Sequence, residues 1–549
     1  MKILVSLILI CALLACSSNK DGRLNPVELE AKIDSLVPTQ VNDTTPGLIV
    51  GIVRGGEIIF SKGYGLANLS YGIANDPSMV FNTGSVTKQF LGYAFAILHV
   101  EGKLSLDDPV SKHLENWPEF DHTVTLRHLL THTSGYREAY TMSNLSGRII
   151  GVDRLSREEC LNVVRKQPQL EFVPGSRWTY NSTAWVILAE VLEKVTGQTA
   201  DEWVAINIFN PLGMKDTQIE SYVGEVIFNS AESYVFNKEE GYANQESNRA
   251  IFGAAEIYSN VPDLAKWTSN FRTAQVGGSE VHDLFLTPFI LNDGTDSEYA
   301  LGIGVGTYRG LKRYRHTGGH EAFSTQLSYY PDHDLGIITI SNFGGKGWIS
   351  TEKIADLFLE DYMTTETARE YAEINLDMET LEQFQGLYLS SDLNDSFTLK
   401  MVEDSLTYEE EENLIPRSPN SFGIEGWNGL MKIENLEDGT TRLTIENGTI
   451  ETYKRVERWS PEVAELKKFE DDYWSEELET LYHVVVKDDQ LQINHRWLGD
   501  IMLKPISPDL FETDWGYTIK FLRNPSNEID GLSVNSGRTL NVLFERINN

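Results

Sequence analysis

The stretch Phe81-Asn-Thr-Gly-Ser-Val-Thr-Lys88 is followed at once by an apolar run from Gln89 to Leu98. This pattern predicts a loop that enters a helix, with Ser85 and Lys88 in its first turn. Residues three apart share a helix face, so the hydroxyl and the amine can meet. A serine hydroxyl needs an adjacent base, and a lysine can serve if burial lowers its pKa. The helix N-terminus also offers free N–H groups that suit an oxyanion.

The Ser-x-x-Lys spacing is a weak signal by itself, because it occurs three times in the chain. The other two copies are Ser17–Lys20 and Ser350–Lys353. The alternative interpretation of each copy is a helix-capping serine with a solvated lysine one turn later. The choice of Ser85 therefore depends on the rest of the sequence.

Composition predicts a folded, acidic protein of two or three domains. The chain has 549 residues, of which 41% are hydrophobic, a fraction typical of globular domains. Its formal net charge is −35, from 46 basic and 81 acidic residues. Phosphate binding needs a basic surface, so this balance argues against a nucleic-acid partner.

The N-terminus has the features of an export signal. A single lysine precedes an apolar run from Ile3 to Cys16, too short to span a bilayer but suited to a signal-peptide core. Leu13-Leu-Ala-Cys16 resembles a bacterial lipoprotein box, which implies cleavage before Cys16 and a lipid on its thiol. The expected location is the cell envelope (periplasm or outer membrane), with the lipid as the one membrane contact. The alternative is ordinary secretory cleavage.

No metal ion or other cofactor is expected. Cys160 is the one cysteine beyond the leader and the expected lipidation site Cys16, and it lies in a helical pattern, which predicts a small core side chain. His128 and His132 lie four apart in a predicted helix over 124–135, but no third ligand accompanies them. We interpret them as core and helix-end residues.

The periodicity of residues 24–363 predicts an antiparallel sheet flanked by helices, with an additional helical subdomain. The expected helices are 26–36, 183–195 and 348–363, and the expected strands are 47–53, 57–61, 301–305, 313–319, 324–330 and 335–341. Residues 364–376 are polar and read as a linker.

The remaining chain repeats itself. Leu381–Tyr388 recurs as Leu466–Tyr473, and Leu414–Phe422 recurs as Leu503–Phe511. Two strand-rich copies of roughly 85 residues fit two small lipocalin-like β-barrels better than a solenoid. Both copies are too acidic and too short of site chemistry to be catalytic. Their loops would either narrow an active-site mouth or merely pack against the first domain.

Three motifs occur in a fixed order: Ser85-Val-Thr-Lys88, Tyr180-Asn-Ser182 and His316-Thr-Gly318. Together they resemble the serine β-lactamase and penicillin-binding-protein family, in the branch with class C enzymes, S12 DD-peptidases, D-aminopeptidases and esterases. Leu129-Leu-Thr-His-Thr-Ser-Gly135 and Pro211-Leu-Gly-Met214 resemble it too. The paired C-terminal barrels look like those of some D-aminopeptidases of this family.

The resemblance implies a role for each motif residue. Ser85 would be the acylated nucleophile, Lys88 its base, and Tyr180 the proton relay to the leaving group; the alternative for Tyr180 is a buried structural tyrosine. His316 would lie beside a substrate carboxylate or steer Tyr180. The N–H groups of Gly319 and Ser85 would form the oxyanion hole.

Thr317 would line the site and Gly318 would keep the strand edge open, which completes the expected substrate-binding set.

Two positions depart from the family pattern. Ser182 stands where the second motif usually has Asn, and His316 stands where class C enzymes usually have Lys. A serine is shorter than an amide, and His is mostly neutral at pH 7. Both changes weaken the grip on a substrate carboxylate. An efficient β-lactamase needs that grip to be firm.

We therefore expect an exported serine hydrolase of α+β fold, acting through an acyl-enzyme on peptides or amides with D-amino acids or on small acylated substrates, with esterase side activity. The alternatives are a β-lactamase, or an envelope module that binds peptidoglycan or acyl groups without turnover. The oligomeric state stays open. The expected organisation is a signal peptide (1–15), a tether (16–23), a hydrolase domain (24–363), a linker (364–376) and two barrels (377–457 and 462–549).

Overall fold

A computed structural model describes most of the chain. The predicted signal peptide, the tether with Cys16 and most of the linker lie outside the described residues. The described residues are 25–547 without 150, 250, 365–373, 392, 394, 410–411, 425–429, 437–439 and 447–449.

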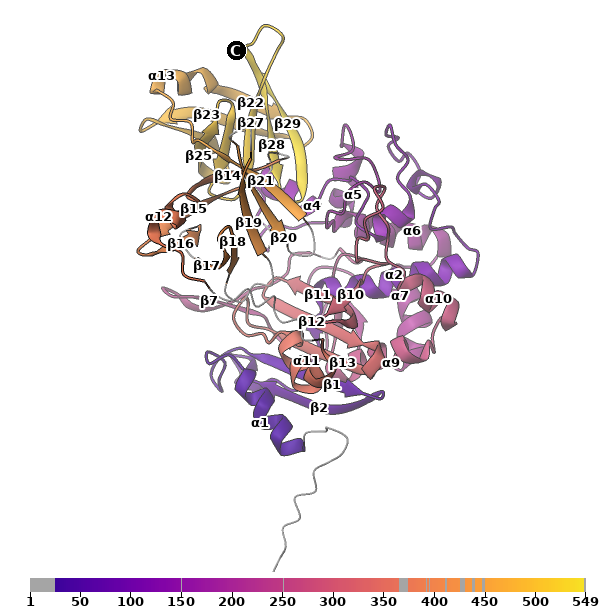
Figure 1. Cartoon of the computed structure of the whole chain (residues 1–549). Coiled ribbons are helices and arrows are strands. Elements are labelled where there is room, and N and C mark those ends of the chain that lie inside the picture. Colours follow the sequence, from indigo (N-terminus) through magenta and orange to yellow (C-terminus); the bar gives the residue numbers. More distant parts are fainter. Residues whose placement is uncertain are drawn as a thin grey trace, which may run out of the picture.

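The first domain is built on a six-stranded antiparallel sheet, as predicted (Figure 1). The strand order is β10-β11-β12-β13-β1-β2, so the N-terminal hairpin joins the sheet beside its last strand. The strands are β1 (Leu48–Arg54), β2 (Glu57–Tyr64), β10 (Gly304–Tyr308), β11 (Leu311–His320), β12 (Phe323–Tyr330) and β13 (Leu335–Ser341).

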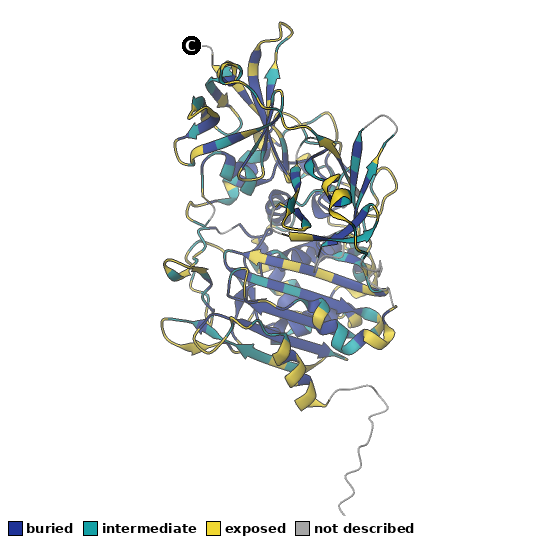
Figure 2. Ribbon diagram, turned by 60° about the vertical axis from the view of Figure 1, so that its left-hand side comes forward, coloured by how far each residue is buried: buried dark blue, intermediate teal, exposed yellow. Residues whose placement is uncertain are grey.

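Helices cover both faces of this sheet, and side chains of β1 alternate between them. Ile49 and Val53 point into the large core, whereas Leu48, Val50 and Ile52 point into a smaller core under α1 and α11. Figure 2 shows the buried middle of the sheet. The helices are α1 (Pro26–Leu36), α2 (Thr87–Val100), α3 (Leu126–Leu130), α4 (Ala139–Leu145), α5 (Arg157–Arg165), α6 (Thr183–Thr196), α7 (Ala200–Val204), α8 (Asn210–Leu212), α9 (Val261–Thr273), α10 (Gly278–Phe285) and α11 (Thr351–Leu359).

Helix α2 runs through the large core and is buried on every side from Thr87 to Leu98. Gly92 allows the close contact with the segment that precedes β10, because an added Cβ would lie 1.8 Å from the Leu301 carbonyl oxygen. Gly302, at φ +88°, packs in the same way against the Lys88 carbonyl. These contacts fix the start of α2, where Ser85 lies.

Three predicted elements differ from the structure, one of them only in that the helix expected over 348–363 begins at Thr351. The helix expected over 124–135 ends at Leu130, because His132 adopts a left-handed backbone with φ 59°. His128 and His132 therefore do not share a helix face. The strand expected at 301–305 begins at Gly304, after the tight packing of Gly302 on α2.

Short segments complete the first domain. The 3-10 turns are η1 (Gly84–Val86), η2 (Val110–Lys112), η4 (Pro331–His333) and η5 (Glu360–Tyr362), and η3 (Ala205–Phe209) is a π-helical turn. The small strands are β3 (Leu66–Asn68), β4 (Ile73–Ala74), β5 (Phe81–Asn82), β6 (Gln218–Ile219), β7 (Tyr234–Asn237), β8 (Gly241–Asn244) and β9 (Ile257–Ser259). Cys160 is buried in a small cluster beside α6. No helix within the described ranges is long and apolar enough to cross a bilayer.

The repeats form two closed eight-stranded antiparallel barrels, as predicted. The Tyr388 hydroxyl donates to the Phe384 carbonyl at 2.8 Å, and Tyr473 repeats this bond to Phe469 at 2.9 Å. The first barrel has β14 (Gly386–Ser390), β15 (Ser396–Val402), β16 (Ser405–Tyr408), β17 (Glu412–Ser418), β18 (Ser421–Ile424), β19 (Leu430–Asn435), β20 (Thr441–Glu446) and β21 (Ile450–Val456) after helix α12 (Met378–Glu382). The second has β22 (Asp471–Ser475), β23 (Thr480–Lys487), β24 (Gln490–His495), β25 (Gly499–Ser507), β26 (Leu510–Thr513), β27 (Thr518–Arg523), β28 (Ile529–Ser536) and β29 (Thr539–Ile547) after α13 (Val463–Leu466) and η6 (Lys467–Phe469).

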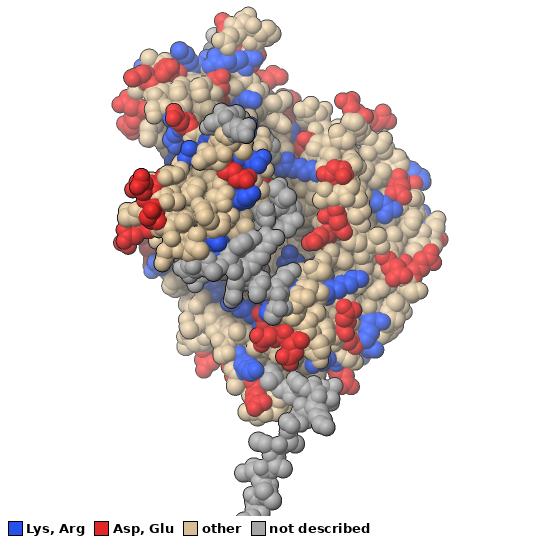
Figure 3. Space-filling view, in the orientation of Figure 1, with Lys and Arg blue, Asp and Glu red and all other residues tan. Residues whose placement is uncertain are grey.

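Helix α4 of the first domain packs into the second barrel. Met142 and Leu145 belong to the same buried cluster as the barrel core, and the Tyr482 hydroxyl donates to the Leu145 carbonyl at 2.8 Å. On the face drawn in Figure 3, acidic and basic side chains are interspersed over both barrels and the first domain. The buried contact of α4 with the second barrel is made by apolar side chains together with the hydrogen bond from Tyr482.

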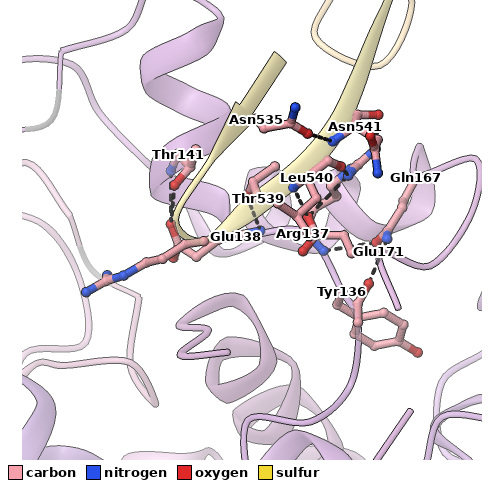
Figure 4. Close-up of polar contacts among 12 residues, drawn as sticks. Tyr136, Arg137, Glu138, Thr141, Gln167, Glu171, Asn535, Thr539, Leu540 and Asn541 are labelled. Atoms are coloured by element: carbon pink, nitrogen blue, oxygen red, sulfur yellow. Dashed lines mark hydrogen bonds and ion pairs between the residues drawn. The ribbon is translucent and has the colours of Figure 1, made fainter. Parts of the chain in front are cut away.

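A buried arginine joins the same two parts. The Arg137 guanidinium donates to both carboxylate oxygens of Glu477 (2.6 and 3.2 Å), to Glu171 (3.2 Å) and to the carbonyls of Leu540 and Asn541. Figure 4 shows how the tip of β28 and β29 descends onto this cluster. Only 1% of the Arg137 side chain is exposed, so its bonds replace those lost to water.

We expect Arg137→Ala to destabilise the protein by about 3–5 kcal/mol, because it leaves two carboxylates and two carbonyls buried without a donor. Denaturant unfolding followed by intrinsic fluorescence measures this loss. Arg127→Ala is the matched control: Arg127 bonds an exposed Asp107, and such a pair contributes about 0–1 kcal/mol. Equal effects of the two changes would contradict the buried role of Arg137.

Candidate active site

Ser85 and Lys88 meet at the start of α2. The Lys88 Nζ lies 3.1 Å from Ser85 Oγ and donates to the Ala254 carbonyl at 2.6 Å. Ser85 lies in η1 and is half-buried, whereas Lys88 is fully buried. The Ser85 hydroxyl is therefore open to the outside, whereas the Lys88 amine is shielded from water.

Burial lowers the pKa of Lys88 from its usual 10.5 to about 7, because a charged amine without water is unfavourable. Glu138 opposes this shift and Arg538 of the second barrel adds to it. At neutral pH a large fraction of the amine is thus free to accept the Ser85 proton.

Tyr180 lies where the loop before α6 reaches Ser85, and its hydroxyl is hydrogen-bonded to Ser85. The Lys88 Nζ lies 5.1 Å from the centre of the Tyr180 ring. Burial raises the pKa of Tyr180 well above its usual value, so the phenol keeps its proton at neutral pH. A neutral phenol can pass a proton without carrying charge.

Strand β11 lies directly against the turn that carries Ser85. An added Cβ at Gly84 would lie 2.7 Å from the Gly319 nitrogen, and one at Gly318 would lie 2.0 Å from the Thr83 carbonyl. Only backbone without side chains fits this contact. It brings the Ser85 and Gly319 nitrogens to one place, where an oxyanion hole was expected.

The edge of β11 beyond Arg315 has no partner in β10, because their pairing ends at Gly304 opposite Arg315. Along this edge Thr317 and Gly319 are exposed, while His316 and Gly318 are buried. An extended substrate could add to such an edge as a further strand.

A chain of hydrogen bonds crosses the floor of the site. The Asn181 N–H donates to His132 Nδ1 (2.9 Å), so His132 carries its proton on Nε2, 3.2 Å from the Tyr299 hydroxyl. That hydroxyl lies 2.8 Å from His316 Nε2, and His316 Nδ1 lies 2.6 Å from the Thr317 carbonyl. These partners assign Nδ1–H to His316 and a donating hydroxyl to Tyr299.

Both histidines of this chain are neutral. Burial, together with the nearby Lys88, lowers the pKa of His316 to about 3 and that of His132 far below its usual value. His316 therefore brings no positive charge to the site, in line with the expected weak grip on a carboxylate.

Asn181 and Ser182, the two polar residues that follow Tyr180 in the second motif, have different contacts. The Asn181 side chain caps α6 at the Ala184 N–H (2.8 Å) and donates to the Tyr136 carbonyl (2.6 Å). Ser182 is buried, and its backbone N–H donates to the Glu138 carboxylate. Asn181 thus has a structural role here and does not replace the amide that Ser182 lacks.

Sequence reasoning missed Glu138, Tyr299 and Arg538. Glu138 is fully buried, accepts from the Thr141 N–H at 2.9 Å, and has one oxygen, Oε1, without a partner. Burial raises its pKa. The adjacent charged residues Arg137 and Glu138, directly after Tyr136, were the one sequence feature that could have indicated Glu138. Nothing in the local sequence marks Tyr299 or Arg538.

The predicted lipidation residue Cys16 lies outside the described residues. Within the part of the chain that the structure describes, no group of His, Cys, Asp or Glu side chains could hold a metal ion.

The family model described as Beta-lactamase matches residues 33–356, more than half of the chain. The chain belongs to the beta-lactamase family. The match includes all three motifs and ends within α11, before the barrels.

Relatives within this beta-lactamase family include penicillin-binding proteins and D-aminopeptidases. The chain is 28% identical to the penicillin-binding-protein-like PbpX of Bacillus subtilis over 299 residues, which cover 53% of this chain and 69% of that protein. It is 24% identical to a D-aminopeptidase of Cereibacter sphaeroides over 302 residues (54% and 57%) and 25% identical to one of Brucella anthropi over 346 residues (63% and 65%). The chain thus spans little more than half to about two thirds of these relatives.

Solved beta-lactamase-like structures share the fold. The octameric penicillin-binding protein homologue from Pyrococcus abyssi matches 86% of this chain and 98% of its own, with 22% identity and a TM-score of 0.54. The penicillin-binding protein from Bacillus halodurans matches 62% and 100%, with 22% identity and a TM-score of 0.52.

The lowered pKa of Lys88 predicts a pH profile for acylation of Ser85. The rate with a neutral ester should rise roughly tenfold per pH unit below about 7 and level off above about 8, because only the neutral amine accepts a proton. Stopped-flow acylation across pH 5–10 measures it. Lys88→Arg, which stays charged, should be inactive throughout. A rate that still climbs steeply beyond pH 9 would mean that the Lys88 pKa is not lowered.

Tyr299→Phe should lower the rate of acylation about 5- to 30-fold without unfolding the protein. The change leaves His132 Nε2 and His316 Nε2 without a partner, at about 1–2 kcal/mol for a buried group. Tyr329→Phe is the matched control, since it removes one hydrogen bond, to Asp334, at the far end of β12. A rate equal to that of this control would contradict a role for the hydrogen-bond chain.

Proposed function

We propose that this protein is a serine hydrolase that forms an acyl-enzyme on Ser85. The observation that carries the proposal is the fully buried Lys88, 3.1 Å from Ser85 Oγ and with its pKa lowered to about 7. A serine beside a solvated lysine would have no such base. The hydroxyl of Tyr180 on the same serine adds a route for the proton.

In the proposed reaction Ser85 Oγ attacks the substrate carbonyl while its proton passes to Lys88. The N–H groups of Ser85 and Gly319 stabilise the oxyanion. Collapse of the tetrahedral intermediate breaks the bond to the leaving amine or alkoxide, which takes a proton through Tyr180. Attack by water on the acyl-enzyme then frees the acid and restores Ser85.

As substrates we propose peptides or amides with D-amino acids, or small acylated molecules, with esters as a side activity. The neutral His316 and the short Ser182 disfavour a β-lactamase, which needs a firm grip on a carboxylate from this strand. Relatives named D-aminopeptidase support the choice. Slow β-lactam hydrolysis fits the same site.

A second candidate is an envelope module that becomes acylated but does not turn over. The complete set of nucleophile, base and relay argues against it, because binding alone needs none of these. Export remains part of the proposal and is supported by the leader and the lipoprotein-like Cys16. Mass spectrometry of the membrane-extracted chain tests the lipid.

We expect Ser85→Ala to abolish labelling by a fluorophosphonate probe while the protein stays folded. Ser350→Ala is the control: Ser350 has the same spacing to a lysine but caps α11, so labelling should persist. Labelling of Ser85→Ala at the wild-type level would refute the assignment.

The substrate class is tested with a cephalosporin reporter, a D-Ala-D-Ala peptide, a D-aminoacyl anilide and a butyrate ester. The peptide, anilide or ester should turn over at least about tenfold faster than the cephalosporin, since a lost hydrogen-bond partner costs roughly 5- to 150-fold in rate. Fast cephalosporin turnover alone would show a β-lactamase. A stable acyl-enzyme with no product would favour the binding module.

A further inference from the structure

We propose that Arg538, at the tip of the second barrel, is a specificity residue that selects substrates with a carboxylate. The inference rests on the proposed function and names the charge of its substrate. It assigns the cation of the active site to a residue that lies more than 350 positions after Tyr180 in the chain.

The position of Arg538 is the first observation. It lies in the two-residue turn between β28 and β29, and its guanidinium is 5.2 Å from the centre of the Tyr180 ring. Tyr180 in turn is hydrogen-bonded to Ser85. A substrate carbonyl at Ser85 therefore has the guanidinium as a near neighbour, with one aromatic ring between them.

The strand that follows Arg538 is held firmly against the first domain. The Glu138 N–H donates to Thr539 Oγ1 at 3.3 Å, and the Leu540 N–H donates to Glu171 at 3.2 Å. Arg137 binds the next two carbonyls (Figure 4). Because these bonds are buried, the side chain of Arg538 projects from a fixed backbone, as recognition requires.

Arg538 is exposed at the surface. Among the described residues no carboxylate forms an ion pair with it, in contrast to Arg137 with Glu477 or Arg249 with Glu321. Glu138, which lies nearby, bonds Thr141 and Ser182 instead. An arginine is always charged and offers a fork of donors that fits a carboxylate.

The rest of the site lacks this charge. Burial and neighbouring groups keep His132 and His316 neutral, and Lys88 has to be neutral to act as base. The cation is thus the Arg538 guanidinium of the second barrel, which lies over the Tyr180 ring, and not a residue of strand β11. A substrate anion would therefore lie at the Tyr180 side of Ser85.

The test uses two matched substrate pairs, because the carboxylate could belong to either half of the substrate. The first pair is the mono-p-nitrophenyl ester of glutaric acid and p-nitrophenyl valerate. The second is N-acetyl-D-Ala-D-Ala and its C-terminal amide. All are measured at pH 8.5, so that a change in the Lys88 pKa, which Arg538 lowers, does not mimic a change in specificity.

For Arg538→Gln we expect kcat/KM for the anionic member of at least one pair to fall about 10- to 100-fold, while its neutral partner changes less than about threefold. Arg538→Lys should recover part of the loss. Arg496→Gln is the matched control: Arg496 is an exposed arginine of the same barrel, 4.6 Å from the ring of its own neighbour Trp497. It should change neither pair.

The pair that responds identifies the half of the substrate with the carboxylate. An unchanged ratio of anionic to neutral kcat/KM in both pairs, or an equal loss for all four substrates, would overturn the inference. Failure of the proposed function is a different result: the wild-type protein would then turn over none of the four, and a fluorophosphonate probe would not label Ser85.

Discussion

The desolvation of one amine is the constraint on which this structure depends. Lys88 is without charge-stabilising water because α2 is packed on all sides and the segment at Gly302 lies on its carbonyl. A buried ammonium is costly, so the protein shifts the pKa rather than supplying a full ion pair. The packing of the first domain thus excludes water from Lys88 while it leaves Ser85 accessible.

The same low polarity determines what surrounds the lysine. The site tolerates His132 and His316 only as neutral rings, and each has its tautomer fixed by a hydrogen-bond partner. Glu138 is similarly held by N–H donors, and burial raises its pKa. A permanent charge fits only at the rim, where water still reaches, and the rim is where the second barrel places an arginine.

Much of the fold follows from local patterns. Asn25 and Pro26 start α1, and Gly197 ends α6 in the left-handed conformation, as their residue types predict. The repeated Phe and Tyr of the barrels make the same bond twice. The sequence did not reveal the break at His132, because its ring accepts a hydrogen bond from the N–H of Asn181, 49 residues away. Tyr299 and Arg538 were not predicted as site residues for the same reason, because only tertiary contacts bring them close to the motifs.

The attachment of Arg538 to the last hairpin has a consequence for biosynthesis. Domains generally fold as units, with the N-terminal one first as the chain emerges. Here the motif residues Ser85, Lys88 and Tyr180 are synthesised long before β28 and β29, which carry Arg538 in their turn. A chain whose synthesis stops before β28 would therefore contain the serine, lysine and tyrosine without the arginine. The surroundings of the serine would thus be completed only when the second barrel has folded onto α4.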